Sequence, residues 1–371
     1  MSTKLNVLIP DGESTWAKNV IQCFNKNSSY DFHVLSGEKK TAIKYSNNIA
    51  SFGFRPLAKD SQERLDWINE VIDEREIAII LPIAEKIMEL LLANVSKINP
   101  KAKMVPLSSK DKFKIAIHKN LLYDFMLANE IAAPKSFKFN HLHELVSVKE
   151  HLRFPVLLKP INGKGGEGII RFDAYEDLSQ YVSGNANLED AIIQELIMGY
   201  DIDCSVLCEK GKILTYTIQK GFIPRKTPYM PQLGIEFIQN DEVLRTVSKL
   251  MAALDWNGVA HIDLIYDEKE KNYKVLEVNG RFWGSLLGSK KVGVNFPELI
   301  LRKTEGYEVE HLGYETKKVI IFKGYFKYFA QKPWMIFNPK VYTYRSTFDS
   351  FLKDPKPSMF RLWEYLIRSF K

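Results

Sequence analysis

The sequence contains few cysteines and no long apolar run. Only three of its 371 residues are cysteine, and their scatter excludes a disulfide framework. Cys204 and Cys208 also lack the second pair of ligands that would make a zinc site. No apolar stretch approaches the roughly 20 residues that a membrane-spanning helix needs, and the first residues show neither the basic region nor the cleavage site of a signal peptide. We therefore expect a cytoplasmic protein with reduced, buried thiols.

The composition is typical of a folded chain with more than one domain. Apolar residues make up 45% and charged residues 26%, and the length exceeds that of an average single domain. The formal net charge of +7 favours anionic partners such as nucleotides, phosphorylated metabolites or a lipid surface. Charge alone does not choose among these partners.

The first segment, residues 1–106, has the pattern of a small α/β domain. Residues 4–10 and 77–83 are short runs rich in Val, Ile and Leu, as expected of buried strands in a parallel sheet, and residues 61–75 between them have a helical pattern. The turn at residues 11–14 has one glycine, too few for a phosphate-binding loop. We predict a small doubly wound parallel sheet with a structural or acceptor-binding role.

The pattern changes in the second segment, residues 107–312. A long amphipathic helix is predicted at residues 109–129, and further helices at 175–182 and 241–254. Strand-like runs occupy residues 155–160, 168–173, 191–197, 203–208, 212–218, 259–266 and 273–278. This is an α+β layout with a mostly antiparallel sheet.

A glycine-rich loop at residues 163–168 has the spacing of a dinucleotide-binding fingerprint. That fingerprint requires a helix directly after the loop, whereas the residues that follow are β-branched and strand-like. A strand, a glycine loop and a returning strand are instead typical of a hairpin that folds over nucleotide phosphates. A protein-kinase loop is excluded because Lys159 precedes the glycines and no kinase catalytic loop follows. A flexible hairpin without a ligand is the remaining alternative.

Acidic and amide side chains interrupt two apolar runs, residues 259–264 and 274–279. Glu277 and Asn279 point to one face of their strand, and Asp263 joins them if the two runs pair. These oxygen ligands suit Mg²⁺, and Arg281 on the same face could hold a terminal phosphate or an acyl phosphate. The alternative is that these charges cap a solvated strand end.

Taken in order, these motifs resemble the ATP-grasp superfamily, whose members include biotin carboxylase, carbamoyl phosphate synthetase and D-alanine–D-alanine ligase. The resemblance runs from Asp111 to Glu298 and implies an α+β ATP-grasp fold, in which two subdomains clasp the nucleotide. Residues 277–285 are most similar to carbamoyl-phosphate-synthetase-like stand-alone ligases, although Gly280 stands where many relatives have proline.

The resemblance also implies a role for each motif residue. The nucleotide phosphates would contact Lys112 and Lys159 and would be covered by Gly163, Gly165, Gly166 and Gly168. The adenine would contact Glu195, Leu196 and Ile197, and the ribose would contact Asp201 in preference to Asp203. The metal would bind Asp263, Glu277 and Asn279, and the catalytic residues would be Arg281 and Lys159. For Lys112 the alternative is an ordinary charge at a helix end. His261 is interpreted as a sheet residue next to the metal and Cys204 as strand packing.

The implied activity is that of a ligase dependent on ATP and Mg²⁺, or on Mn²⁺ in its place. A small-molecule carboxylate would become an acyl phosphate and pass to an amine, with release of ADP and phosphate. A phosphotransferase on the same fold is the first rival, and a nucleotide-binding module without turnover is the second. The sequence identifies neither substrate, and the insert at residues 221–228 and the N-terminal domain are expected to select them.

The third segment, residues 313–371, is basic and aromatic and ends in a helical pattern from residue 348. Packing against the rest of the protein is the expected role, because aromatic residues at this density are more often buried than exposed. Peripheral contact with an anionic membrane is the alternative. Nucleic acid is not expected as a partner because no recognised binding motif accompanies the charge. The oligomeric state is left open.

Overall fold

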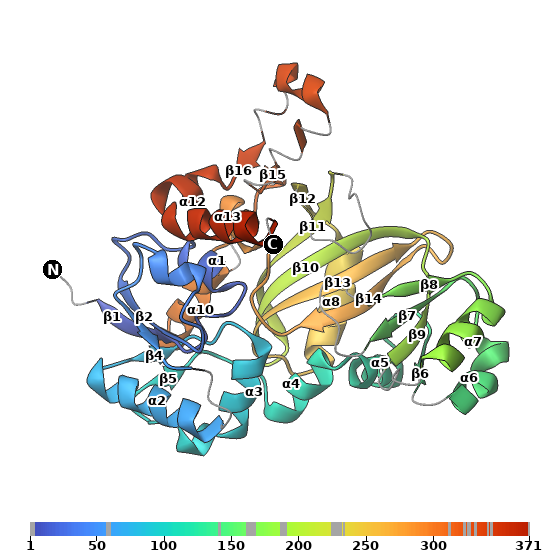
Figure 1. Ribbon diagram of the computed structural model, residues 1–371, viewed down its shortest axis with the longest axis horizontal. Coiled ribbons are helices and arrows are strands. Elements are labelled where there is room, and N and C mark those ends of the chain that lie inside the picture. The colour runs from blue at the N-terminus through green and yellow to red at the C-terminus, as the bar shows by residue number, and fades with distance from the viewer. Residues whose placement is uncertain are drawn as a thin grey trace.

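The protein, described here by a computed structural model, has three β-sheets with helices packed against them (Figure 1). The structure describes residues 4–56, 61–139, 142–160, 168–185, 191–223, 232, 234–310 and 313–321, and beyond these 324, 328–329, 332–339, 341 and 344–369. An α/β domain precedes an α+β region, as the sequence predicts.

The N-terminal domain contains a five-stranded parallel sheet in the order β3-β2-β1-β4-β5. Along β1, Val7 and Ile9 belong to one core and Leu8 to another. A strand buried on both faces is apolar throughout, which is why this run lacks polar alternation. Strands added on both sides of β1 make the sheet doubly wound, as predicted. The bounds are β1 Leu5–Ile9, β2 Tyr30–Ser36, β3 Ser51–Phe54, β4 Ile79–Ile80 and β5 Lys103–Met104, with α1 Ala17–Ile21, α2 Ser61–Glu74, α3 Glu85–Ala93 and the 3₁₀ turns η1 Ala42–Tyr45 and η2 Val95–Lys97.

A smaller antiparallel sheet, in the order β6-β9-β7-β8, carries Lys159 on β7. Val156 and Leu158 pack into a core shared with α6 and α7. Because side chains alternate along a strand, Lys159 points to the opposite face. The bounds are β6 Ser136–Phe139, β7 Val156–Pro160, β8 Ile170–Phe172, β9 Ala191–Glu195, α6 Leu142–Val148, η3 Lys149–His151 and α7 Tyr175–Gly184.

The large sheet has seven strands in the order β14-β13-β10-β11-β12-β15-β16, and all pairs except the last are antiparallel. The helix α8 (Asp241–Ala253) covers one face, where Val247 and Leu250 pack with Ile202 and Cys204 of β10. Cys204 and the other two cysteines are free and buried, as predicted. The bounds are β10 Gly199–Glu209, β11 Lys212–Gly221, β12 Gly234–Ile238, β13 Gly258–Asp267, β14 Asn272–Asn279, β15 Lys318–Ile320 and β16 Arg345–Ser346, with α9 Leu286–Lys291 and α10 Phe296–Glu305.

The helix predicted at residues 109–129 is in fact two helices. The helices α4 (Lys110–Ile117) and α5 (Lys119–Ala128) are separated at His118, whose backbone is extended. No proline or glycine marks this break in the sequence. The break allows Phe113 in α4 and Met126 in α5 to pack into the same core beneath the large sheet. It also places Lys119 at the start of a new helix.

The segment beyond residue 312 contacts both earlier parts of the molecule. Its strands β15 and β16 extend the large sheet. The helix α13 (Lys356–Ser369) lies against η1, where Phe360 stacks on Tyr45 with ring centroids 4.7 Å apart. Asp354, which follows α12 (Phe348–Lys353), is 1% exposed and accepts hydrogen bonds from the Ser46 hydroxyl and the Asn47 N–H. A further 3₁₀ turn is η4 (Pro333–Phe337).

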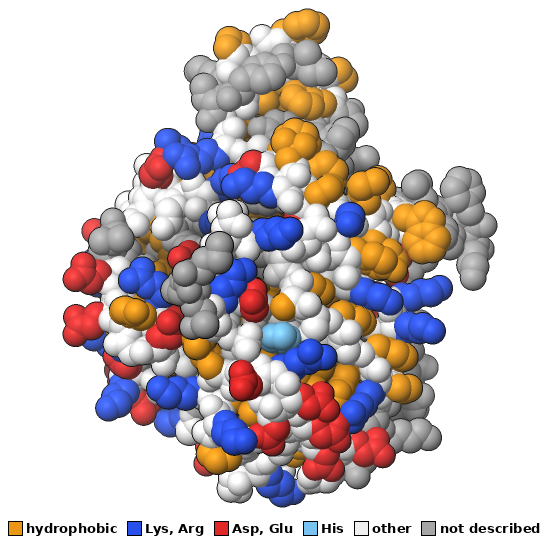
Figure 2. Space-filling view, turned by 90° about the vertical axis from the view of Figure 1, so that its left-hand side faces the viewer, with side chains coloured by type: hydrophobic (Ala, Val, Ile, Leu, Met, Phe, Trp, Pro, Cys, Tyr) orange, Lys and Arg blue, Asp and Glu red, His pale blue; other side chains and the backbone are white. Residues whose placement is uncertain are grey.

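Some apolar side chains of this segment are exposed: Phe348, Leu352, Met359, Leu362 and Trp363. Seen from the side on which α12 lies in Figure 1, the surface carries hydrophobic side chains among lysines and arginines (Figure 2). Among the described residues, no helix is both long and apolar enough to span a membrane. Peripheral membrane contact and the three domain boundaries stay predictions, and the oligomeric state stays open.

Candidate functional site

Polar side chains line the face of the large sheet opposite to α8. They alternate with the apolar residues that pack beneath α8, and the strand registers arrange them in two rows. The first row is Gln219, Asp203, Asp263 and Glu277, and the second is Thr217, Ser205, His261 and Asn279. Directly paired residues have Cβ atoms about 4.5–5.5 Å apart, so each row is a continuous polar strip across four strands.

Asp263 and Glu277 lie opposite each other and share a hydrogen bond. Burial and the charge of Glu277 raise the pKa of Asp263 well above its usual range. Burial also opposes ionisation of Glu277, but the hydrogen bond and the charges of Lys119 and Lys159 lower its pKa. The two carboxylates therefore differ in acidity, and each acts on the ionisation of the other.

An amide and a guanidinium continue this network. Asn279 Nδ2 donates to Glu277 Oε1 at 3.2 Å, and Arg281 Nη2 donates to Asn279 Oδ1 at 2.6 Å. The guanidinium also lies 3.7 Å from Glu85 Oε1, at the start of α3. The side chains predicted as metal ligands thus lie on one face beside Arg281, and the N-terminal domain reaches the same place.

Lys159 approaches these carboxylates from the small sheet. Its Nζ donates to Gln194 Oε1 at 2.6 Å, and burial lowers its pKa to about 8 although the charge of Glu277 opposes this shift. The charge of Lys119 contributes to lowering the pKa of both Lys159 and Glu277. Lys119 Nζ also donates a hydrogen bond to the Pro160 carbonyl at 3.4 Å. Two lysines therefore accompany the carboxylate pair.

The other residues predicted to meet phosphate are placed differently or not described. Lys112 stands in the first turn of α4, with its Nζ 5.2 Å from the centre of the Phe125 ring. Gly163, Gly165 and Gly166 lie outside the described residues, as do residues 224–228 of the insert. Gly168 has a φ of +75°, and a Cβ added there would come within 3.0 Å of Pro160 Cγ. This position requires glycine on backbone grounds alone.

The predicted hinge begins at the end of β9. Glu195 Oε1 accepts a hydrogen bond from the Lys135 N–H at 2.8 Å and lies 3.3 Å from Lys274 Nζ on β14. Leu196 and Ile197 follow, both partly buried, before β10 begins. The Glu195 carboxylate therefore connects the small sheet to the large one.

We expect Lys274→Met to lower the free energy of unfolding by about 2 kcal/mol. The side chain of Lys274 is 5% exposed and lies 2.9 Å from Asp267 Oδ2, with Glu195 and Glu270 also in ion-pair range. Removing the ammonium leaves the buried Asp267 carboxylate without this cation. Urea unfolding measures the effect, and Lys269→Met, exposed on the same hairpin, is the control. Equal midpoints for the two variants would contradict this role.

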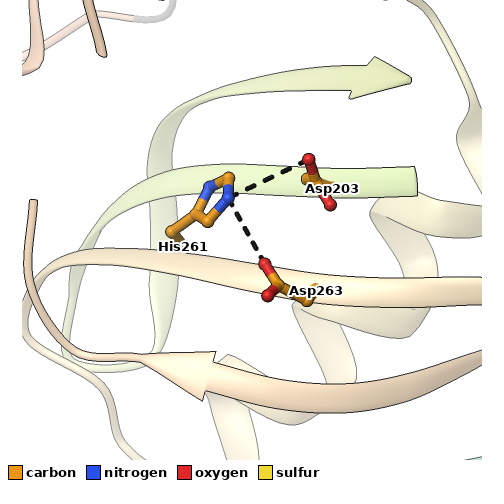
Figure 3. Close-up of side chains that lie close together, drawn as sticks. All are labelled: Asp203, His261 and Asp263. Atoms are coloured by element: carbon orange, nitrogen blue, oxygen red, sulfur yellow. Dashed lines mark ion pairs between the residues drawn. The ribbon is translucent and has the colours of Figure 1, made fainter. Parts of the chain in front are cut away.

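Two aspartates of β10 are candidates for the ribose contact, and the structure gives them different surroundings. The charge of Asp201 opposes the fall in the pKa of Lys159, which places Asp201 on the Lys159 side of the site. Asp203 instead accepts a hydrogen bond from Gln219 Nε2 at 3.2 Å and lies 4.0 Å from His261 Nε2 (Figure 3). The choice of Asp201 over Asp203 for the ribose stays a prediction.

His261 lies between two aspartates as a neutral imidazole. Burial, together with the charge of Arg281, lowers its pKa to about 3. Its Nδ1 is 2.9 Å from Ser205 Oγ, its Nε2 is 3.3 Å from Asp263 Oδ1, and its ring stacks on Trp283 with centroids 5.3 Å apart. These contacts fit the interpretation of His261 as a sheet residue beside the carboxylates.

The sequence interpretation missed Lys119 and the polar strip of β11. Thr215, Thr217 and Gln219 are all buried and alternate with less polar residues, so a period of two was visible in the sequence. Lys119 gave no signal, because its position depends on the break at His118.

Three comparisons connect this site with known proteins. Residues 116–285 match the family described as the ATP-grasp domain. A D-alanine–D-alanine ligase of Buchnera aphidicola is 29% identical over 165 residues, which are 41% of this chain and 54% of that protein. A carbamoyl phosphate synthase large chain of Clostridium beijerinckii is 26% identical over 274 residues, which are 70% of this chain and 24% of that protein. The matched regions thus span about half of the first relative's length and a quarter of the second's.

The crystal structure of an L-amino acid ligase from Bacillus licheniformis is similar in fold. The two structures have a TM-score of 0.60 and 17% sequence identity, over 82% of this chain and 74% of that one. At this identity the likeness shows a shared fold.

Proposed function

Since this chain carries an ATP-grasp domain, as its sequence predicts, we propose that it is a ligase that uses ATP to join a carboxylate to an amine. The carboxylate would be activated as an acyl phosphate, with ADP and phosphate as the other products. One observation supports this most directly: Asp263, Glu277 and Asn279 form a single oxygen-rich set on the large sheet, and Lys159 approaches it from the small sheet. Both substrates would be small molecules.

Asp263, Glu277 and Asn279 would hold Mg²⁺, or Mn²⁺ in its place. Two carboxylates and an amide carbonyl are the ligand types that these cations prefer. The two carboxylates lie directly opposite each other on paired strands, and such a pair suits a divalent cation, since cation binding favours the deprotonated form. When bound, the ion would neutralise phosphate charge that otherwise repels the incoming carboxylate.

The remaining site residues are assigned to the nucleotide. Lys159 and Lys112 would bind its phosphates, and we add Lys119 because it lies beside Lys159 and Glu277. The glycines at 163, 165, 166 and 168 would cover the phosphates and exclude water. The adenine edge is assigned to Glu195, Leu196 and Ile197, and the ribose to Asp201.

The proposed reaction has two steps. A carboxylate oxygen of the first substrate attacks the γ-phosphorus of ATP, the bond to the bridging oxygen breaks, and ADP leaves. Arg281 and Lys159 stabilise the charge on the transferring group. The amine then attacks the acyl carbon, the carbon–oxygen bond to phosphate breaks, and inorganic phosphate leaves while the amine releases its protons to solvent. No protein side chain has to form a covalent intermediate.

Oxygen from the substrate carboxylate should therefore appear in the released phosphate. A screen for ADP release over pairs of carboxylates and amines identifies the substrates, and ¹⁸O-labelled carboxylate then tests the route. We expect one labelled oxygen per phosphate by mass spectrometry. Free phosphate without label would contradict the acyl phosphate. A phosphorylated product without free phosphate would favour the phosphotransferase rival, and binding of ATP without ADP release from any pair would favour a nucleotide-binding module.

A further inference from the structure

Trp16, the residue directly before α1, packs against the loop that carries Arg281. The guanidinium carbon of Arg281 lies over the face of the Trp16 ring, 5.8 Å from the ring centre. The outer edge of the same ring contacts Gly284, where an added Cβ would be 3.1 Å from Trp16 Cη2. Asn19 Nδ2, on α1, donates to the Gly284 carbonyl at 3.4 Å. The start of α1 therefore rests on the loop that follows β14.

The Trp16 ring restrains the guanidinium in a direction that its hydrogen bonds do not. Arg281 Nη1 donates to the Phe282 carbonyl at 2.9 Å, and Arg281 Nη2 donates to Asn279 Oδ1 at 2.6 Å. The N–H groups of a guanidinium point outward in its own plane, so these bonds hold its edge. An aromatic ring attracts the cation through its face instead. Trp16 is thus placed to oppose movement of the guanidinium out of that plane.

The backbone next to Trp16 is held by the C-terminal helix α13. Arg361 Nη2 donates to the Thr15 carbonyl at 2.7 Å. On the other side of Trp16 in the sequence, Lys18 Nζ donates to Ser358 Oγ at 3.2 Å. In keeping with these contacts, α13 lies beside α1 (Figure 1). A shift of α13 would therefore move the backbone that carries the Trp16 ring.

We propose that Trp16 is a positioning residue for Arg281, and that α13 keeps Trp16 in place by holding Thr15. This inference rests on the function proposed above, in which Arg281 binds the phosphoryl group that is transferred. Without the ring, Arg281 keeps its hydrogen bonds, but its guanidinium spends less time in the orientation that meets the γ-phosphate. The C-terminal segment therefore contributes to the phosphate site through the N-terminal domain.

Nucleotide binding to the full chain tests this role without a known substrate. Calorimetry in the presence of Mg²⁺ gives the affinities for ADP and for a non-hydrolysable ATP analogue. Their ratio reports on the γ-phosphate contact, because all other parts of the two nucleotides are shared. Retained ADP affinity also verifies that a variant is folded. The variants are Trp16→Leu, Trp16→Phe, Arg361→Met and Arg281→Met, and the matched controls are the exposed Trp334→Leu and Arg245→Met.

We expect Trp16→Leu to lower the ratio of analogue to ADP affinity about fivefold, with ADP affinity unchanged. Trp16→Phe keeps an aromatic face and should stay within about twofold of the wild type. Arg361→Met should lower the ratio in the same direction as Trp16→Leu, and both controls should leave it unchanged. Arg281→Met should lower the ratio at least as much, and adding Trp16→Leu to it should have no further effect, because the ring acts through Arg281.

An unchanged ratio in Trp16→Leu, or equal losses of ADP and analogue affinity, would overturn the positioning role. If Trp16→Leu does not fold, Arg361→Met decides, since it leaves the ring in the chain, and an unchanged ratio there overturns the proposal. An unchanged ratio in Arg281→Met would also overturn it, because Trp16 would then have no phosphate ligand to position, while the labelled-phosphate test of the ligase stays intact. Failure of the wild type to bind either nucleotide would instead remove the proposed function itself, and this inference with it.

Discussion

Glu277→Gln should lower kcat by about 10²–10³-fold while ATP affinity changes little. Glutamine keeps the shape of Glu277 and an oxygen that can accept from Asn279 Nδ2. It removes the negative charge proposed to hold the cation, and that charge matters most when the phosphoryl group is in transfer. ADP release at saturating and limiting Mg²⁺ gives kcat, and calorimetry with an ATP analogue gives the affinity.

The control for this variant is Glu268→Gln. Glu268 is exposed near the turn between β13 and β14, so the same chemical change on the same hairpin should leave kcat at the wild-type value. Wild-type turnover by Glu277→Gln at limiting Mg²⁺ would refute the metal assignment, whereas a drop in ATP affinity with an unchanged kcat at saturating ATP would place Glu277 in nucleotide binding alone.

Lys159→Met should weaken ATP binding by about 10²-fold and at the same time stabilise the protein without nucleotide. Burial lowers the pKa of Lys159 to about 8, so the charged form of Lys159 destabilises the folded protein as long as no phosphate is bound beside it. The folded-state pKa lies below the ordinary lysine value of 10.5, so the unfolded state binds more protons between these two values. Wild-type stability should therefore rise with pH through this window, and the variant should lack that rise.

Urea unfolding at pH 7 and near pH 10 measures this difference, and calorimetry measures ATP binding. Lys138→Met is the matched control, since Lys138 lies on β6 of the same small sheet and forms an exposed ion pair with Asp124. That variant should bind ATP as the wild type does. A lower stability of Lys159→Met than of the wild type at pH 7 would contradict this prediction. It would mean that the hydrogen bond to Gln194 stabilises the folded protein by more than burial of the charge destabilises it.

The parts of the site that the sequence predicts are those held close together by local structure. Glu277 and Asn279 share one strand, and Asp263 lies on the neighbouring strand of the same hairpin, so alternation and one turn were sufficient to group them. Asp203 and Gln219 lie beside these residues only because β10 pairs with β13 and β11. No local pattern in the sequence specifies which distant strand lies next to β10.

Local pattern also failed where packing overrides it. The spacing of apolar residues over 109–129 is amphipathic throughout. The helix is nevertheless interrupted at His118, because both halves pack onto one core. Lys119 is near Lys159 only as a result of that break. Likewise, the sequence shows that the C-terminal segment is aromatic, but not that β15 pairs with β12 to lengthen the large sheet.

The burial of Asp354 against the N-terminal domain has a consequence for how the chain is made. Its carboxylate is satisfied by Ser46 across a separation of 308 residues and by Asn47 next to it, and its carbonyl accepts from Gln22 Nε2. Such long-range contacts form late, because loop closure over that distance costs entropy before any contact is gained. During synthesis the N-terminal sheet can assemble early, but this part of its surface stays uncovered until the ribosome has passed residue 354. A nascent chain stalled earlier would expose that surface to chaperones and proteases.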